Sequence, residues 1–174
     1  GIFLIMNNNN VDFTSISLLN LAFVEVFNVR QNNNLATVQF ANLESVGSKF
    51  YLVTNTSLSV ASFPALEIVG ENLISEYQIS SGVFEINQCI NLLNLNFSSL
   101  TTVNGRVDVI QNNNLQSLGF QNLTTILRDI RINNNPALAS INGLALTGNV
   151  TSFSLIGSNV VHLNTLSGMT SIGF

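Results

Sequence analysis

Few side chains in this sequence have the chemistry and the spacing of a catalytic site. Glu85, Asp108 and Arg131 lie 23 positions apart from one another in turn, and this spacing recurs along the chain. If the three residues align in successive turns of a repeating structure, the two carboxylates match the acid and nucleophile pair of a glycosidase. The same alignment places Arg131 beside Asp108. We therefore expect a solvated row of charges, in which the arginine offsets the carboxylate, and not an active site.

The other candidate nucleophiles and bases are isolated. His162 is the only histidine and has no carboxylate near it in the sequence, so we expect no functional role for it. Cys89 is the only cysteine, which excludes an internal disulfide framework, and we interpret it as a buried structural residue and not as a reactive thiol. Zinc-ligand spacings, a Gly-rich phosphate loop and a G-x-S-x-G turn are missing from the sequence. We predict a protein that is not an enzyme and that uses no cofactor or metal.

The composition narrows the class of partner. Charged residues make up only 8% of the chain, against roughly 25% in an ordinary soluble domain. Hydrophobic residues make up 46%, so uncharged polar residues replace the usual charges, and disorder is not expected. The formal net charge of −4, with five basic residues, argues against a nucleic-acid partner. No apolar run reaches the length of about 18 residues that a transmembrane helix needs.

Short apolar strands recur along the chain at a nearly constant spacing. The expected strands start at Phe3, Phe27, Phe50, Phe84, Val107, Ile130 and Phe153. The steps between these starts are 24, 23, 34, 23, 23 and 23 residues. Such a period is typical of a solenoid, in which each coil buries its apolar face against its neighbours. We predict one solenoid domain over residues 1–174, with about seven coils and an insertion near residues 71–83.

Two kinds of residue in each coil are expected to point inward. Alternate strand residues share one face and form the pairs Phe3/Ile5, Phe27/Val29, Phe50/Leu52, Phe84/Ile86, Val107/Val109, Ile130/Ile132 and Phe153/Leu155. Eight residues after each strand start stands an aliphatic anchor: Val11, Leu35, Leu58, Leu92, Leu115, Leu138 and Val161. Stacking of the coils also places four aromatic rings in one column: Phe40, Phe63, Phe97 and Phe120. This pattern predicts a mainly β, right-handed parallel β-solenoid with coils of about 23 residues.

A polar column is expected at the bend after each strand. Its members stand three residues before each anchor: Asn8, Asn32, Asn55, Cys89, Asn112, Asn135 and Ser158. An asparagine at a bend tolerates left-handed backbone geometry, and its amide can bond neighbouring backbone groups. We therefore predict a structural asparagine ladder, in which Cys89 and Ser158 are small substitutes.

With these columns, the chain resembles receptor L-domains and leucine-rich-repeat-like solenoids. The repeats of that family follow a pattern close to L-x-I-x-x-N-x-x-L-x-x-L-x-x-L-x-x-V-x-G. The segments that carry it here are FNVRQNNNLATVQFANLESVG (27–47), VDVIQNNNLQSLGFQNLTTI (107–126) and IRINNNPALASINGL (130–144). The resemblance covers essentially the whole chain. It implies a secreted or wall-associated surface protein, as in microbial members, or a receptor ectodomain module, as in animal members.

Two further features bear on contacts with partners. The 34-residue step adds residues around ENLISEYQISSG (71–82), where Tyr77 is a candidate contact residue. The outward charged residues are further contact candidates: Glu85, Asp108 and Arg131. A partial coil is the alternative, because Leu73 lies 23 residues after Phe50. Four N-x-S/T sequons are present. We expect Asn55 to face inward without a sugar, Asn96 and Asn122 to point outward, and Asn149 to lie in a looser turn.

These features together predict an extracellular or cell-surface protein. Our first hypothesis is a structural or adhesion scaffold that contacts protein partners, including copies of itself end to end or side by side, as in a filament. Neither end of the chain shows a polar capping repeat, which predicts either a segment of a longer protein or end-to-end stacking. The alternatives are an ectodomain that binds a peptide or glycan, an ice-binding protein and a carbohydrate-active enzyme. The outward column is too irregular for ice: Leu4, Asn28, Tyr51, Glu85, Asp108, Arg131 and Ser154.

Overall fold

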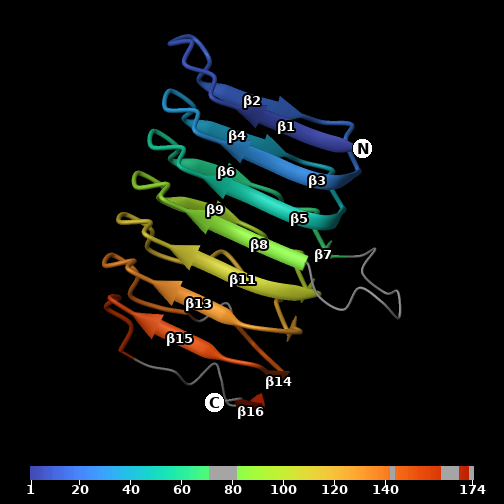
Figure 1. Cartoon of the computed structure of the whole chain (residues 1–174), viewed down its shortest axis with the longest axis vertical. Coiled ribbons are helices and arrows are strands. Elements are labelled where there is room, and N and C mark those ends of the chain that lie inside the picture. Colours follow the sequence, from blue (N-terminus) through green and yellow to red (C-terminus); the bar gives the residue numbers. More distant parts are fainter. Residues whose placement is uncertain (71–81, 142–143, 162–168, 173–174) are drawn as a thin grey trace.

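Parallel strands stack coil upon coil along one axis of the molecule (Figure 1). The computed structural model describes residues 1–70, 82–141, 144–161 and 169–172. Within these ranges the chain forms strands, bends and turns but no helix, so no described helix could cross a membrane. The predicted parallel β-solenoid is therefore confirmed.

The larger of the sheets contains ten strands, all parallel to their neighbours. Seven of them lie at the predicted strand positions: β1 (Ile2–Met6), β3 (Phe23–Arg30), β5 (Ser45–Val53), β8 (Gly82–Asn87), β11 (Gly105–Ile110), β13 (Ile130–Asn133) and β15 (Phe153–Ile156). The other three are short: β7 (Ile68–Val69), β10 (Thr102–Val103) and β12 (Thr125–Ile126). Strand β5 is long because it pairs with two strands: Ser45 and Val46 pair with β7, and Lys49–Val53 pair with β8.

A second sheet lies on the opposite side of the coils. It contains β2 (Ser15–Leu18), β4 (Thr37–Phe40), β6 (Val60–Ser62) and β9 (Asn94–Asn96) in this order. Gly119, one coil after Asn96, has a φ of +67°, which breaks the extended backbone, and a Cβ there would meet the Leu95 carbonyl oxygen at 2.4 Å. This geometry explains why the sheet does not continue past β9. Strands β14 (Gly148–Val150) and β16 (Met169–Ile172) form a separate pair.

The register of the larger sheet follows the period of the sequence. Each residue of the outward column pairs with the next along the stack: Leu4, Asn28, Tyr51, Glu85, Asp108, Arg131 and Ser154. Phe50 pairs with Phe84 across the 34-residue step, so β5 and β8 are neighbouring strands of the sheet. Gly82 and Val83 already belong to β8. The rest of the expected insertion, with Leu73 of the alternative partial coil and Tyr77, lies outside the described residues.

The core is built around two columns of phenylalanine rings. Phe40, Phe63 and Phe97 stack at centroid distances of 5.5 and 5.2 Å, and Phe120 follows at 5.9 Å with a tilt of 52°. A second column is formed by inward strand residues, whose ring centroids stack at 4.8–5.2 Å: Phe3, Phe27, Phe50 and Phe84. The sequence predicts that these residues point inward, but it does not predict that their rings stack. The two columns meet edge to face at 5.0–5.5 Å, the arrangement that the ring quadrupole favours.

The aliphatic anchors behave differently in the middle and at the ends of the stack. The five central anchors are fully buried: Leu35, Leu58, Leu92, Leu115 and Leu138. Val11 and Val161 are 73% and 77% exposed, although the pattern predicts them to point inward. An anchor is covered by the coils on its two sides, and each of these valines has a described neighbouring coil on one side only.

Replacing Phe63 with alanine should destabilise the stack strongly. Phe63 is fully buried and contacts rings in both columns, so Phe63→Ala should lower the free energy of unfolding by about 4 kcal/mol through lost burial and a residual cavity. Phe23→Ala is the matched control, because that ring is 42% exposed and its loss should cost about 1 kcal/mol. Urea unfolding followed by far-UV circular dichroism measures both. Equal losses would contradict the described core.

Candidate functional site

The asparagine column forms a hydrogen-bond ladder inside the bend that follows each strand. The backbone N–H of Asn8 donates to Asn32 Oδ1 at 3.0 Å, and that of Asn32 donates to Asn55 Oδ1 at 3.0 Å. Further along, Asn112 donates in the same way to Asn135 at 2.9 Å. The side-chain amides donate in turn to the backbone of the preceding coil, as from Asn112 Nδ2 to the Ile86 carbonyl oxygen. The four central asparagines are fully buried, so this column is structural: Asn32, Asn55, Asn112 and Asn135.

The left-handed backbone lies one residue before the ladder and not on it. The φ angles are 54–57° at Asn7, Gln31, Thr54, Gln88, Gln111 and Asn134, and Gly157 continues the column at 66°. The N–H of each of the six non-glycine residues donates to the end of the strand in the next coil, as from Gln88 to the Ile110 carbonyl oxygen and from Gln111 to that of Asn133, both at 3.0 Å. These bonds hold the strained bends in register.

Cys89 replaces asparagine inside the ladder. Its N–H donates to Asn112 Oδ1 at 3.0 Å, and its Sγ lies 3.6 Å from the Leu52 carbonyl oxygen. The residue is fully buried, and this burial raises the pKa of the thiol to about 12. Because the thiolate is the reactive form, the structure favours the structural interpretation of Cys89.

Stability should fall in alkaline solution because of this thiol. The unfolded thiol ionises above its ordinary pKa of 9.0, whereas the folded thiol keeps its proton up to a pKa of about 12. The unfolded state therefore binds fewer protons between these values, and stability declines as the pH rises through this window. Between about pH 8 and pH 10 the loss should be ~1 kcal/mol.

The comparison variant for this experiment is Cys89→Ser, because serine does not titrate in this range and Ser158 occupies the same column. Urea unfolding at both pH values should show the additional loss in the parent protein only. The same pH dependence in both proteins would mean that the thiol is not the cause.

The predicted row of charges contains a compact ion-pair cluster around Asp108. Arg131 binds the carboxylate with two hydrogen bonds, Nε to Oδ1 and a terminal nitrogen to Oδ2, both at 2.6 Å. Arg106 Nε lies 3.0 Å from Oδ2 on the other side, at an angle that makes an ion pair but no hydrogen bond. The hydrogen bond to Asp108 raises the pKa of Arg131 above its ordinary value. Asp108 itself is 1% exposed, so the row is not solvated at this position.

Glu85 does not join this cluster. It pairs in register with Asp108 along the sheet, but its Oε1 accepts a hydrogen bond from Asn87 Nδ2 at 3.1 Å. The two carboxylates are therefore aligned as expected, while Asp108 is covered by guanidinium groups and presents no open face to a substrate. Among the residues that the structure describes, no group of acidic, histidine or cysteine side chains could hold a metal ion. His162 lies outside the described residues.

Removing the charge of Asp108 should destabilise the sheet, whereas removing the charge of the neighbouring Glu85 should have little effect on stability. Asp108→Asn leaves two guanidinium groups without their shared anion, and the free energy of unfolding should fall by about 2 kcal/mol, less than for a fully buried pair because both arginines are partly solvated. Glu85→Gln should cost under about 0.5 kcal/mol. Thermal unfolding measures both, and a larger loss for Glu85→Gln would contradict the assignment of the cluster.

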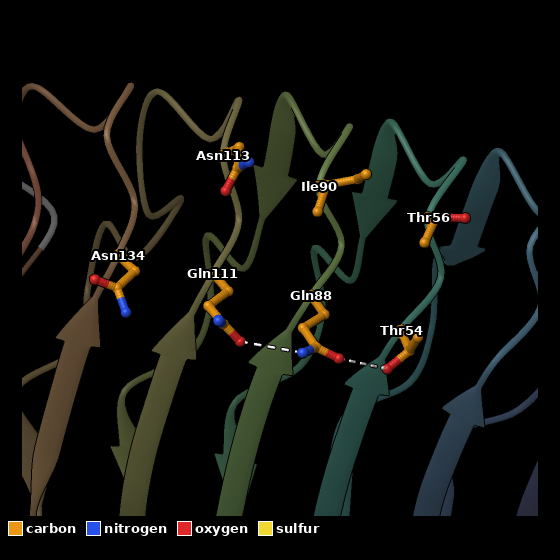
Figure 2. Close-up of a pocket in the computed structure, with 7 residues that line it drawn as sticks. All are labelled: Thr54, Thr56, Gln88, Ile90, Gln111, Asn113 and Asn134. Carbon is orange, nitrogen blue, oxygen red and sulfur yellow. Dashed lines mark hydrogen bonds between the residues drawn. The ribbon is translucent and has the colours of Figure 1, made fainter.

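An uncharged groove follows the bends on the outside of the stack (Figure 2). It has a volume of about 370 Å³ and is lined by Thr54, Thr56, Gln88, Ile90, Gln111, Asn113 and Asn134. Thr54 Oγ1 donates to Gln88 Oε1, and Gln88 Nε2 donates to Gln111 Oε1, both at 3.1 Å. The groove thus contains a second, exposed ladder beside the buried one.

The residues of this groove were not predicted as a site. Its signal is the residue four places after each strand start, which is an amide or a hydroxyl residue in six coils: Asn7, Gln31, Thr54, Gln88, Gln111 and Asn134. Only the structure shows that this position has left-handed backbone and carries its side chains outward in a row.

The sequon asparagines lie in different environments. Asn55 is buried in the ladder, as expected. Asn122 is exposed, and its Nδ2 donates to the Ser98 carbonyl oxygen at 2.7 Å, while Asn96 is half-buried with Nδ2 3.4 Å from Ser62 Oγ. Asn149 belongs to strand β14 and not to a turn. Asn122 is therefore more open than Asn55 and Asn96.

Comparisons with protein-family models, with curated proteins and with solved structures found no match for this chain. The resemblance to receptor L-domains stays a prediction that rests on the repeat pattern. What the geometry defines is the class of protein: a parallel β-solenoid with a buried ladder, an uncharged outer groove and a covered ion-pair cluster.

Proposed function

We propose that this protein is a non-enzymatic structural or adhesion scaffold that works outside the cell through the rigid surface of its solenoid. The observation that carries this proposal is the register of the outward column from β1 to β15, because each of its residues pairs with the next and equivalent positions therefore recur on the surface at each coil. Such a surface offers many similar contacts along one direction, as scaffolds and adhesion modules require.

Exposed apolar side chains on β1 support contact with a protein partner. Ile2, Leu4 and Met6 alternate along the outward face of this strand and are 70%, 55% and 42% exposed. Large apolar groups that gather on one face of a chain with so few charges mark an interaction surface. A second copy of the chain is the partner that we propose, in end-to-end or side-by-side contact.

The open sequon at Asn122 supports a secretory route in a eukaryotic host. The lack of an accessible carboxylate pair at Glu85 and Asp108 supports a role without catalysis. The groove of Figure 2 favours ligand recognition as a second function, because it adds a continuous row of hydrogen-bonding groups to the scaffold.

Self-association should depend on concentration and on Leu4. Sedimentation velocity over a dilution series, with negative-stain images of the same samples, should show assemblies that dissociate on dilution. Leu4→Lys places a charge in the apolar face and should weaken association by at least about tenfold.

Ser17→Lys is the matched control for this prediction, because Ser17 is exposed on β2 in the second sheet. It should leave the association unchanged. A monomer at every concentration would refute self-assembly, and glycan cleavage that Asp108→Asn abolishes would refute the non-enzymatic role.

A further inference from the structure

We infer that the groove lined by Thr54, Gln88, Gln111 and Asn134 binds an extended, neutral, β-1,4-linked polysaccharide laid parallel to the axis of the solenoid. This inference rests on the second proposed role, ligand recognition, and supplies the class of ligand. It requires no self-association and no bond cleavage.

The chemistry of the groove suits a neutral sugar polymer. None of the seven residues that line it is charged: four carry side-chain amides, two carry hydroxyl groups, and Ile90 is apolar and 39% exposed. Amide and hydroxyl groups match the hydroxyl groups of a sugar, and an exposed aliphatic group can pack against the C–H face of a sugar ring. A phosphate, an acidic polymer or a basic peptide would find no opposite charge among these residues.

The amide groups of the groove keep free donors and acceptors after they have bonded to one another. A glutamine amide has two N–H donors and two acceptor lone pairs. Gln88 uses one donor toward Gln111 and one lone pair toward Thr54, so one donor and one acceptor are left for a ligand. Gln88, Gln111 and Asn134 are exposed. The four coils therefore present amide or hydroxyl groups at equivalent positions, and Gln88 keeps one donor and one acceptor for a ligand.

The spacing of these groups discriminates between two extended ligands. Neighbouring parallel strands lie about 4.8 Å apart, and the stacked rings of Phe27, Phe50 and Phe84 show this spacing here at 4.8 and 4.9 Å. A β-1,4-linked chain of hexoses advances by nearly the same distance for each sugar, and because successive sugars are rotated by about half a turn, its like-facing groups recur at every second coil. An extended peptide advances by about 3.3 Å for each residue, and its like-facing side chains recur at about twice that distance, so it would lose register with the groove.

The groove is also fixed before a ligand arrives. The bends that carry Gln88 and Gln111 are held by backbone hydrogen bonds of 3.0 Å to the next coil, and the buried asparagine ladder runs directly beside them. The bond between the two glutamine amides orients both side chains. A ligand would therefore meet groups that are already ordered, which lowers the entropic cost of binding.

Calorimetric titration with cello-oligosaccharides, from the disaccharide to the hexasaccharide, tests the inference. The affinity should rise with each added sugar up to the tetrasaccharide and then level off, because the groove spans the four coils from Thr54 to Asn134. The β-1,3-linked tetrasaccharide has the same composition but a curved chain with another advance per sugar, and it should bind at least about tenfold more weakly.

Two variants locate the binding site in the groove. The double variant Gln88→Ala with Gln111→Ala removes the exposed ladder, and Ile90→Ser removes the apolar contact without changing a left-handed residue. Each should weaken binding of the tetrasaccharide by at least about tenfold. Gln39→Ala on the second sheet, which removes an exposed glutamine amide elsewhere, should bind as the parent does. Far-UV circular dichroism of each variant verifies the fold, and Ile90→Ser preserves the test if the double variant does not fold.

Several outcomes would overturn the inference. These are no binding of any cello-oligosaccharide, equal affinity for both linkages, unchanged binding by Ile90→Ser, or capture of an extended uncharged peptide in preference to the sugars. Self-association measured by sedimentation is a separate readout. Failure of sugar binding with intact assembly would refute the ligand alone, and failure of assembly with intact sugar binding would refute the scaffold alone.

Discussion

At the end of each strand the backbone must leave the sheet without leaving its polar groups unpaired, and this constraint shapes the rest of the molecule. The bend needs one residue with positive φ, a conformation that is costly for side chains other than glycine. In the part of the chain that the structure describes, this strain occurs at six non-glycine positions, from Asn7 to Asn134. The backbone N–H of each strained residue donates to the next coil. The N–H of Asn32, which follows one such residue, donates to the Asn55 side chain of the next coil, and that of Asn112 donates to the Asn135 side chain in the same way. Neither arrangement works unless adjacent coils are in register.

Register at the bend then fixes the core. Once the ladder aligns the coils, residues of the same type come to lie over one another, and two columns of phenylalanine rings stack through the centre. Large apolar burial in every coil explains how a chain with 8% charged residues can fold. Asp108 on the sheet face is paired with Arg106 of its own strand and with Arg131 of the next coil.

Much of this architecture was predictable from the spacing of residues alone. The strand starts, the register of the outward column and the stack of Phe40, Phe63 and Phe97 all follow from a period of about 23 residues. The burial of Asp108 was not predictable, because it depends on where two long arginine side chains lie and not on where their backbone lies. The exposure of Val11 was also missed, since a repeat pattern assumes neighbouring coils on both sides. The groove was missed because a row of glutamine, threonine and asparagine has no chemical motif, and only backbone conformation turns those side chains outward.

The backbone hydrogen bonds at this corner share one direction. In the buried and left-handed columns the backbone N–H of the earlier coil donates to an acceptor of the later coil, and Gln88 does the same in the groove, while the buried asparagine amides also donate back to the preceding coil. The two directions along this corner are therefore chemically unlike. A polymer with distinguishable ends that lies along this corner would meet different partners when reversed, so the solenoid can impose a single sense of orientation on whatever it aligns.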